Sequence, residues 1–176
     1  MSPRHNCEKI ELLVSIFGVY WFVDESDREP TVPTFEAERY VHTTRERAWE
    51  VVSDVANLGD HAPNLSKTEV LDGAGEGMVR RCYNKSGSGW NERCTLWQPG
   101  YRYMMEVDTS DYPYPLSKMR GTWEVKERSG GALIHLRYDY EMKYGPVGAV
   151  LAALMRPVFA RACQKMLDSY ERGIDA

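Results

Sequence analysis

Two charged residues, Arg80 and Glu92, fall within strand-like runs of apolar residues and are the side chains best placed for chemistry. Every second residue of a β-strand faces the same side, so Arg80 shares a face with Cys82, and Glu92 shares one with Trp90. If both faces are the inner ones, the two charges must pair with each other or with a polar ligand group, because an unpaired buried charge is costly. Arg80 would then bind a ligand carboxylate, phenolate or enolate, while Glu92 would hold the guanidinium or act as a base. If the register is shifted by one residue, both side chains lie on the solvated face instead.

Aromatic residues and methionines are the remaining candidates for ligand contact. The same alternation places Tyr103, Trp123 and Tyr138 on the inner face, where their polar atoms could orient a bound molecule. Each of these side chains is equally consistent with an ordinary place in the hydrophobic core. The complete set of predicted ligand-contacting residues is Arg80, Trp90, Glu92, Tyr103, Met105, Trp123, Tyr138, Tyr140, Met155 and Phe159.

Metal-binding and covalent chemistries lack the residue patterns that they require. His42, His61 and His135 are not clustered, and the four cysteines form no C-x-x-C pair. We therefore expect no metal site, no cofactor and no covalent nucleophile. We expect free thiols in a reducing cytoplasm, with a disulfide between Cys82 and Cys94 across a hairpin as the alternative.

The bulk composition is that of an ordinary globular protein. The 176 residues are enough for one well-buried core, and 43% are hydrophobic and 27% charged. The formal net charge is −4 and the basic residues are scattered. Because binding to phosphates requires clustered lysine and arginine, the sequence argues against nucleic acid as a partner.

Regular strand and helix signals begin at Thr34. Thr43 or Thr44 is expected to cap a helix, and residues 57–63 predict one further short helical turn that ends at a proline. Short glycine-rich connections such as Gly73–Gly77 leave no room for parallel crossovers, so the strands should form an antiparallel meander. The expected strands are 34–42, 66–72, 77–84, 90–97, 101–108, 117–127 and 132–143.

Residues 145–173 predict one long C-terminal helix with a single buried face. Apolar residues recur every three or four positions, and Pro146 is tolerated in the first helical turn. At 1.5 Å per residue the helix would be roughly 40 Å long, enough to lie across a whole sheet. The residues expected on its buried face are Val147, Val150, Leu151, Leu154, Val158, Cys163, Met166, Leu167 and Tyr170.

Residues 1–33 differ from the rest and are expected to form an extension, with residues 34–176 as the folded domain. Leu12–Val23 is almost wholly apolar, and Asp24–Pro33 is an acidic linker. The apolar run is shorter than the about 20 residues needed to span a bilayer, and no secretory cleavage site follows it. It is a membrane-associated segment, a strand that docks on a partner, or an extension without a role of its own. We expect no stable membrane span and a cytoplasmic location.

Several stretches of the chain resemble the START-like, or SRPBCC, superfamily, which includes polyketide cyclases, lipid-transfer proteins and hormone receptors of the Bet v 1 type. The resemblance covers about residues 34–172. It implies an α+β helix-grip fold, in which a curved antiparallel sheet wraps around a long C-terminal helix and two short helices follow the first strand. The stretches that carry it are Arg45–Asp54, Gly59–Asn64, Asn91–Cys94, Gly121–Trp123, Gly130–Gly131 and Gly145–Tyr170.

The resemblance also implies a cavity between the sheet and the terminal helix. We predict that the protein binds or transports a small hydrophobic ligand there, such as a lipid, an isoprenoid or a polyketide-like molecule. A second hypothesis is an enzyme of the polyketide cyclase, aromatase or dehydratase type that uses the same cavity. A third is an accessory protein that binds ubiquinone or a larger assembly. The sequence leaves the oligomeric state open.

Overall fold

The computed structural model describes residues 33–176, which contain all of the predicted folded domain. Leu12–Val23, Cys7 and all but the last residue of the acidic linker lie outside the described residues. The predicted roles of these segments therefore stay predictions.

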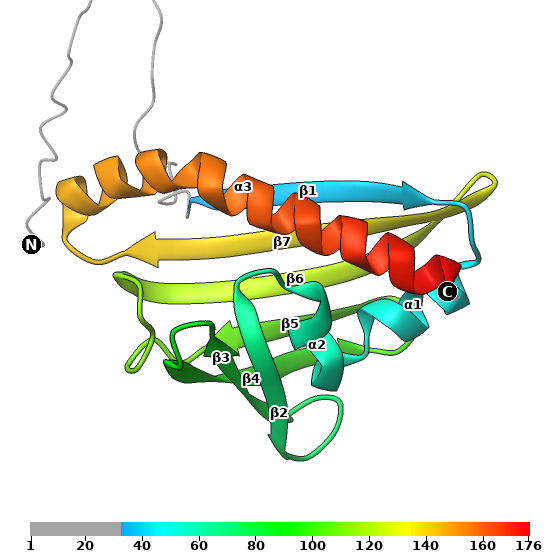
Figure 1. Ribbon diagram of the computed structural model, residues 1–176, viewed down its shortest axis with the longest axis horizontal. Helices are drawn as coiled ribbons and strands as arrows, with labels where there is room; N and C mark the ends of the chain where they lie inside the picture. Colours follow the sequence, from blue (N-terminus) through cyan, green and yellow to red (C-terminus); the bar gives the residue numbers. More distant parts are fainter. Residues whose placement is uncertain (1–32) are drawn as a thin grey trace, which may run out of the picture. The chain divides into compact units, whose positions relative to one another are not determined.

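One antiparallel sheet and three α-helices make up the described part of the chain, as the sequence predicted. The sheet has seven strands in the order β1-β7-β6-β5-β4-β3-β2, and long α3 crosses it beside β1 and β7 (Figure 1). This is the predicted α+β helix-grip arrangement. The strands are β1 (Thr34–Val41), β2 (Leu65–Asp72), β3 (Val79–Asn84), β4 (Gly89–Gln98), β5 (Arg102–Val107), β6 (Leu116–Arg128) and β7 (Gly131–Met142). The helices are α1 (Arg45–Val52), the 3-10 helix η2 (Val55–Asn57), α2 (Leu58–His61) and α3 (Gly145–Asp175).

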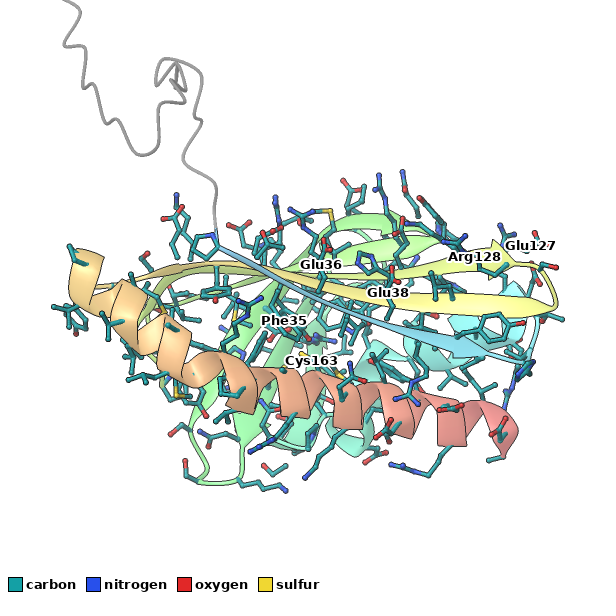
Figure 2. All side chains as sticks on the ribbon, turned by 90° about the horizontal axis from the view of Figure 1, so that it is seen from above. Phe35, Glu36, Glu38, Glu127, Arg128 and Cys163 are labelled. Carbon is teal, nitrogen blue, oxygen red and sulfur yellow. The ribbon has the colours of Figure 1, made fainter. Side chains whose placement is uncertain are left out.

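The inner face of the sheet is the one that period-2 alternation predicted. On β7, Ile134 and Leu136 are fully buried, while charged residues alternate with them. On β1, Phe35 lies between the sheet and α3, whereas Glu36 and Glu38 project from the opposite face (Figure 2). The hydrophobic core therefore lies between the inner face and the helices.

Glycine allows a large side chain to lie flat on the inner face of β6. A Cβ atom on Gly121 would lie 2.6 Å from the Trp123 ring and 3.1 Å from the Tyr138 ring. No residue with a side chain fits there unless the rings move. Gly121 and Trp123, which belong to the stretches that carry the family resemblance, are thus needed together for the packing of the inner face.

Only the second half of α3 packs as the sequence predicted. Cys163, Met166 and Tyr170 are buried, and α3 contacts β1, β7, α1 and α2. The prediction of one continuous buried face is wrong for the first half, where the exposed residues are Val147, Val150, Leu154 and Val158. The five-residue step from Val158 to Cys163 turns a helix by roughly 140°, so the two apolar sets lie on different faces.

The three cysteines in the described part of the chain, Cys82, Cys94 and Cys163, are free and buried. In the register of β3 and β4, Cys82 is paired with Trp90, and Cys94 is paired with Met105 of β5. The two thiols thus do not face each other across the hairpin. The expectation of free thiols is confirmed for these residues.

Candidate functional site

Arg80 and Glu92 form an ion pair inside the core. They are directly paired neighbours on β3 and β4, and both side chains point to the inner face. Arg80 donates from Nε (3.0 Å) and Nη2 (2.6 Å) to Oε2 of Glu92, and its Nη1 donates to the Val55 carbonyl at 3.4 Å. The Trp90 Nε1 donates to Oε1 of Glu92 at 2.8 Å. Burial by itself would lower the pKa of Arg80, but the charge and hydrogen bonds of Glu92, together with Cys82 and Tyr103, raise that pKa above its usual value.

Aromatic side chains enclose this ion pair. The Trp123 ring stacks on Tyr103, with centroids 5.0 Å apart and planes at 7°, and the Arg80 guanidinium lies 5.6 Å from the Trp123 ring. Tyr103 donates from its hydroxyl to the Val52 carbonyl at 3.0 Å. The inner face of β3–β6 therefore carries a charged pair within a shell of aromatic rings.

Two polar atoms beside this shell lack a hydrogen-bond partner. Trp123 Nε1 and the Tyr170 hydroxyl are buried and form no hydrogen bond with any described residue. They lie close to each other and to Tyr103: burial raises the pKa of Tyr170, and polar contact with Trp123 and Tyr103 lowers it in part. Neither contact of Tyr170 reaches the distance and angle of a hydrogen bond. An unpaired buried donor costs about 1–3 kcal/mol, so these atoms are unusual in a core.

The tyrosine hydroxyls of the site remain protonated at neutral pH. Burial raises the pKa of Tyr103, Tyr138 and Tyr170 well above the ordinary value. These hydroxyls are therefore hydrogen-bond donors. Burial likewise raises the pKa of the Cys163 thiol to about 12, which makes it a poor nucleophile.

Sequence reasoning missed Tyr112 as a part of this site. It lies in the connection between β5 and β6, and its ring packs edge-on against Trp90, with centroids 4.9 Å apart. Burial and the nearby Glu92 raise its pKa. The only signal in the sequence was the alternation of tyrosine and proline in 112–115, and it does not distinguish Tyr112 from Tyr114, which is 43% exposed. Tyr170 was predicted as a packing residue, but its unpaired hydroxyl was not foreseen.

The structure brings most of the predicted ligand-contacting residues together. Arg80, Trp90, Glu92, Tyr103, Met105, Trp123 and Tyr138 are all buried on the inner face. Tyr138 also contacts Phe159 of α3, with ring centroids 5.1 Å apart, and Tyr140 is half-buried. Met155 stands apart, since 40% of its surface is exposed. Whether these residues contact a ligand stays a prediction.

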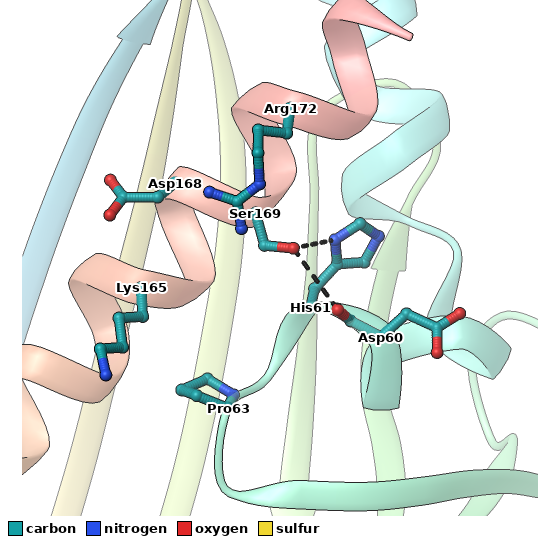
Figure 3. A pocket seen from close by; sticks show the side chains of 7 residues that line it. All are labelled: Asp60, His61, Pro63, Lys165, Asp168, Ser169 and Arg172. Carbon is teal, nitrogen blue, oxygen red and sulfur yellow. Dashed lines mark hydrogen bonds between the residues drawn. The ribbon is translucent and has the colours of Figure 1, made fainter.

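Two pockets in the described part of the chain lie at its surface. One, of about 260 Å³, lies between α2 and α3, where His61 faces Ser169 at 3.1 Å (Figure 3). The other, of about 310 Å³, is lined by residues of β3–β5 and includes only Glu92 of the predicted set. Neither is the predicted cavity between the sheet and α3. Aromatic and aliphatic side chains occupy that space in this conformation.

The described residues include no group of three or more histidine, cysteine, aspartate or glutamate side chains that could hold a metal ion. The polar atoms of the buried cluster are instead suited to binding an oxygen-bearing organic molecule. A sequence model for the family "Polyketide cyclase / dehydrase and lipid transport" matches residues 32–173. The chain belongs to this family.

The solved structures that resemble this family member have the same fold at low sequence identity. The ZhuI aromatase/cyclase from Streptomyces sp. R1128 has a TM-score of 0.68 and 18% identity, over 81% of this chain and 93% of that chain. TTHA0849 from Thermus thermophilus has a TM-score of 0.66 and 20% identity, over 81% and 97%. Ara h 8.0201 has a TM-score of 0.64 and 17% identity, over 81% and 97%. No curated protein matches the chain in sequence.

His61 lines the pocket between α2 and α3, and its titration is expected to make the stability of the folded protein depend on pH. Partial burial is the main cause that lowers the pKa of His61 below 6.5, so the unfolded chain binds a proton that the folded chain resists. Stability is therefore expected to fall as the pH drops from about 6.5 to the lower folded-state pKa. His61→Gln should show a smaller loss of melting temperature between pH 7.5 and pH 5 than the unchanged protein. An equal loss in both proteins would contradict this assignment.

Proposed function

We propose that the protein binds a small apolar molecule that carries a polar oxygen, between the inner face of the sheet and α3. The observation that supports this most is the pair of buried, unpartnered donors, Trp123 Nε1 and the Tyr170 hydroxyl. A carbonyl, phenolate or carboxylate oxygen placed between them would accept two hydrogen bonds in a site whose walls are apolar. The membership of the family supports the same class of ligand.

The ligand would enter beneath the first half of α3. Between Gly145 and Val158 only Gly148 is buried, so this half of the helix makes few packing contacts. Segments with few buried apolar contacts open at lower free-energy cost than the core. Movement of this half would uncover Tyr138 and Phe159, whose rings lead towards Trp123.

Binding is favoured over catalysis by the contacts of Glu92. Both carboxylate oxygens already accept hydrogen bonds, from Arg80 and from Trp90, and the carboxylate is the counter-ion of a fully buried guanidinium. A proton taken from a ligand would leave the charge of Arg80 uncompensated in the core. The cyclase hypothesis would depend on Tyr170, which has the free hydroxyl of the cluster. A cytoplasmic location and a domain boundary near residue 33 remain parts of this proposal.

Two conservative substitutions test the proposal in the full chain. Trp123→Phe and Tyr170→Phe remove one donor each and keep an aromatic ring, and Tyr40→Phe is the control, because its hydroxyl bonds the Ser129 carbonyl at the surface. The probe is 8-anilinonaphthalene-1-sulfonate, an apolar fluorophore with an anionic acceptor. We expect saturable binding that weakens about 10-fold in the Trp123/Tyr170 double variant, as two lost hydrogen bonds of about 0.7 kcal/mol would give.

Native mass spectrometry of the purified full chain complements the titration. A mass above that of the denatured chain would reveal a retained small molecule and begin to identify it. Absence of saturable probe binding, together with equal native and denatured masses, would contradict the proposal. So would equal weakening in the Tyr40→Phe control.

A further inference from the structure

The first half of α3 carries an apolar stripe that faces away from the core. Its residues lie three or four positions apart and so share one side of the helix. The stripe consists of Val147, Val150, Leu154 and Val158, with 72%, 63%, 69% and 55% of their surfaces exposed. Buried Cys163 lies roughly 160° around the helix from Val147. The stripe is therefore not a wall of the ligand site, and nothing within the described domain covers it.

The exposure of this stripe is unlike that of a core helix. By length and composition α3 could cross a membrane, which by itself is weak evidence because core helices often meet the same criteria. Here only 11% of the apolar window of α3 is buried, whereas a core helix is mostly buried. The second half of α3 is packed on the sheet and on α1, so the helix cannot span a bilayer while the fold persists. No described residue covers the stripe, so whatever covers it lies outside the described domain.

The charges around the stripe indicate which kind of surface. Arg161 and Lys165 are exposed and continue the same face of the helix, one and two turns beyond Val158. From Lys143 to Leu167 the sequence contains four basic residues and no acidic one, although the whole chain has a net charge of −4. A second copy of the chain would offer Arg161 and Lys165 no acidic partner on its own stripe. An anionic surface would offer both residues negatively charged partners.

We propose that this face of α3 docks on an anionic lipid bilayer. The stripe of Val147, Val150, Leu154 and Val158 enters the boundary between headgroups and acyl chains, and Arg161 and Lys165 contact lipid phosphates. The helix lies along the membrane surface while its opposite face stays packed on the domain. This inference is independent of the ligand proposal, because vesicle binding and probe binding are separate measurements.

Co-sedimentation of the full chain with vesicles tests the docking. We expect binding to vesicles of phosphatidylcholine with about 30% phosphatidylglycerol, a proportion of anionic lipid that gives an effective surface potential, and little to phosphatidylcholine alone. Leu154→Asp should weaken binding about 10- to 100-fold, because a leucine gains that much from burial. Leu71→Asp is the matched control, since Leu71 on β2 is 54% exposed but lies away from α3.

A second pair of variants tests the electrostatic contribution to membrane docking. Arg161→Gln with Lys165→Gln should weaken binding to the anionic vesicles about 30-fold, from about 1 kcal/mol for each charge near the surface. Lys85→Gln with Arg128→Gln removes the same charge from an exposed turn and from the exposed end of β6, and should change binding little. Added salt should weaken the binding of the unchanged protein.

Three results would overturn the proposal. One is no binding to anionic vesicles at low salt. Another is that Leu71→Asp, or Ile16→Asp in the apolar run of residues 12–23, abolishes binding while Leu154→Asp keeps it. The third is a stable dimer in solution that Leu154→Asp converts to monomer, which would assign the stripe to a second copy of the chain.

Discussion

Glu92→Gln is expected to lower the free energy of unfolding by about 3–5 kcal/mol, because it leaves the charge of Arg80 buried without its counter-ion. Arg80 is fully buried, and two of its three hydrogen bonds go to Glu92. Urea denaturation of the full chain measures the effect. Glu141→Gln is the control, because Glu141 pairs with the exposed Lys118. A surface pair of that kind contributes about 0–1 kcal/mol.

The double variant Arg80→Met, Glu92→Leu separates a structural role of this pair from a role in binding. Replacing both charges by apolar residues of similar size often restores stability. We therefore expect the double variant to regain most of what Glu92→Gln loses. If it folds but no longer binds the anionic fluorophore, the pair serves the ligand. A loss below about 1 kcal/mol for Glu92→Gln would show that water or a neighbouring group already compensates Arg80.

Trp123→Ala is expected to destabilise the protein by about 3–5 kcal/mol, through lost burial and the cavity left behind. The ring is 3% exposed, stacks on Tyr103 and meets Tyr138 edge-on, with centroids 5.6 Å apart. Chemical denaturation again gives the value. Leu71→Ala on β2 is the control and should change stability by less than about 0.5 kcal/mol, because Leu71 is largely exposed.

The Trp123 result also bears on the site. Trp123→Phe keeps an aromatic ring and most of the packing, and it removes Nε1, which has no partner in the core, with part of the indole. It should therefore cost much less stability than Trp123→Ala while weakening binding of the fluorophore. Equal destabilisation by both substitutions would show that Nε1 has a structural partner, and would remove the strongest support for the ligand site.

The sequence determined the fold class, the order of elements and the inner face of the sheet. Period-2 alternation on strands such as β7 fixes which residues are buried, since each strand has only two faces and one of them is covered. The same rule left two possibilities for Arg80 and Glu92, the inner face or the solvated one, and the structure places both on the inner face, where they are direct partners. Most neighbouring strands of this sheet are also consecutive in the chain and are joined by short hairpins. The local sequence pattern is therefore enough to predict which strands pair.

Helix α3 shows what only the tertiary structure decided. Its apolar residues satisfy the helical period on two different faces, and a sequence cannot tell which of them the sheet covers. The packing of Cys163, Met166 and Tyr170 against the rest of the domain decides that, and it turns the other apolar face, with Val147 and Val158, towards solvent. The unpaired atoms of Trp123 and Tyr170 arise in the same way. They lie far apart in the chain, and only the packing of α3 on the sheet brings them together, beside Tyr103 but without a hydrogen bond.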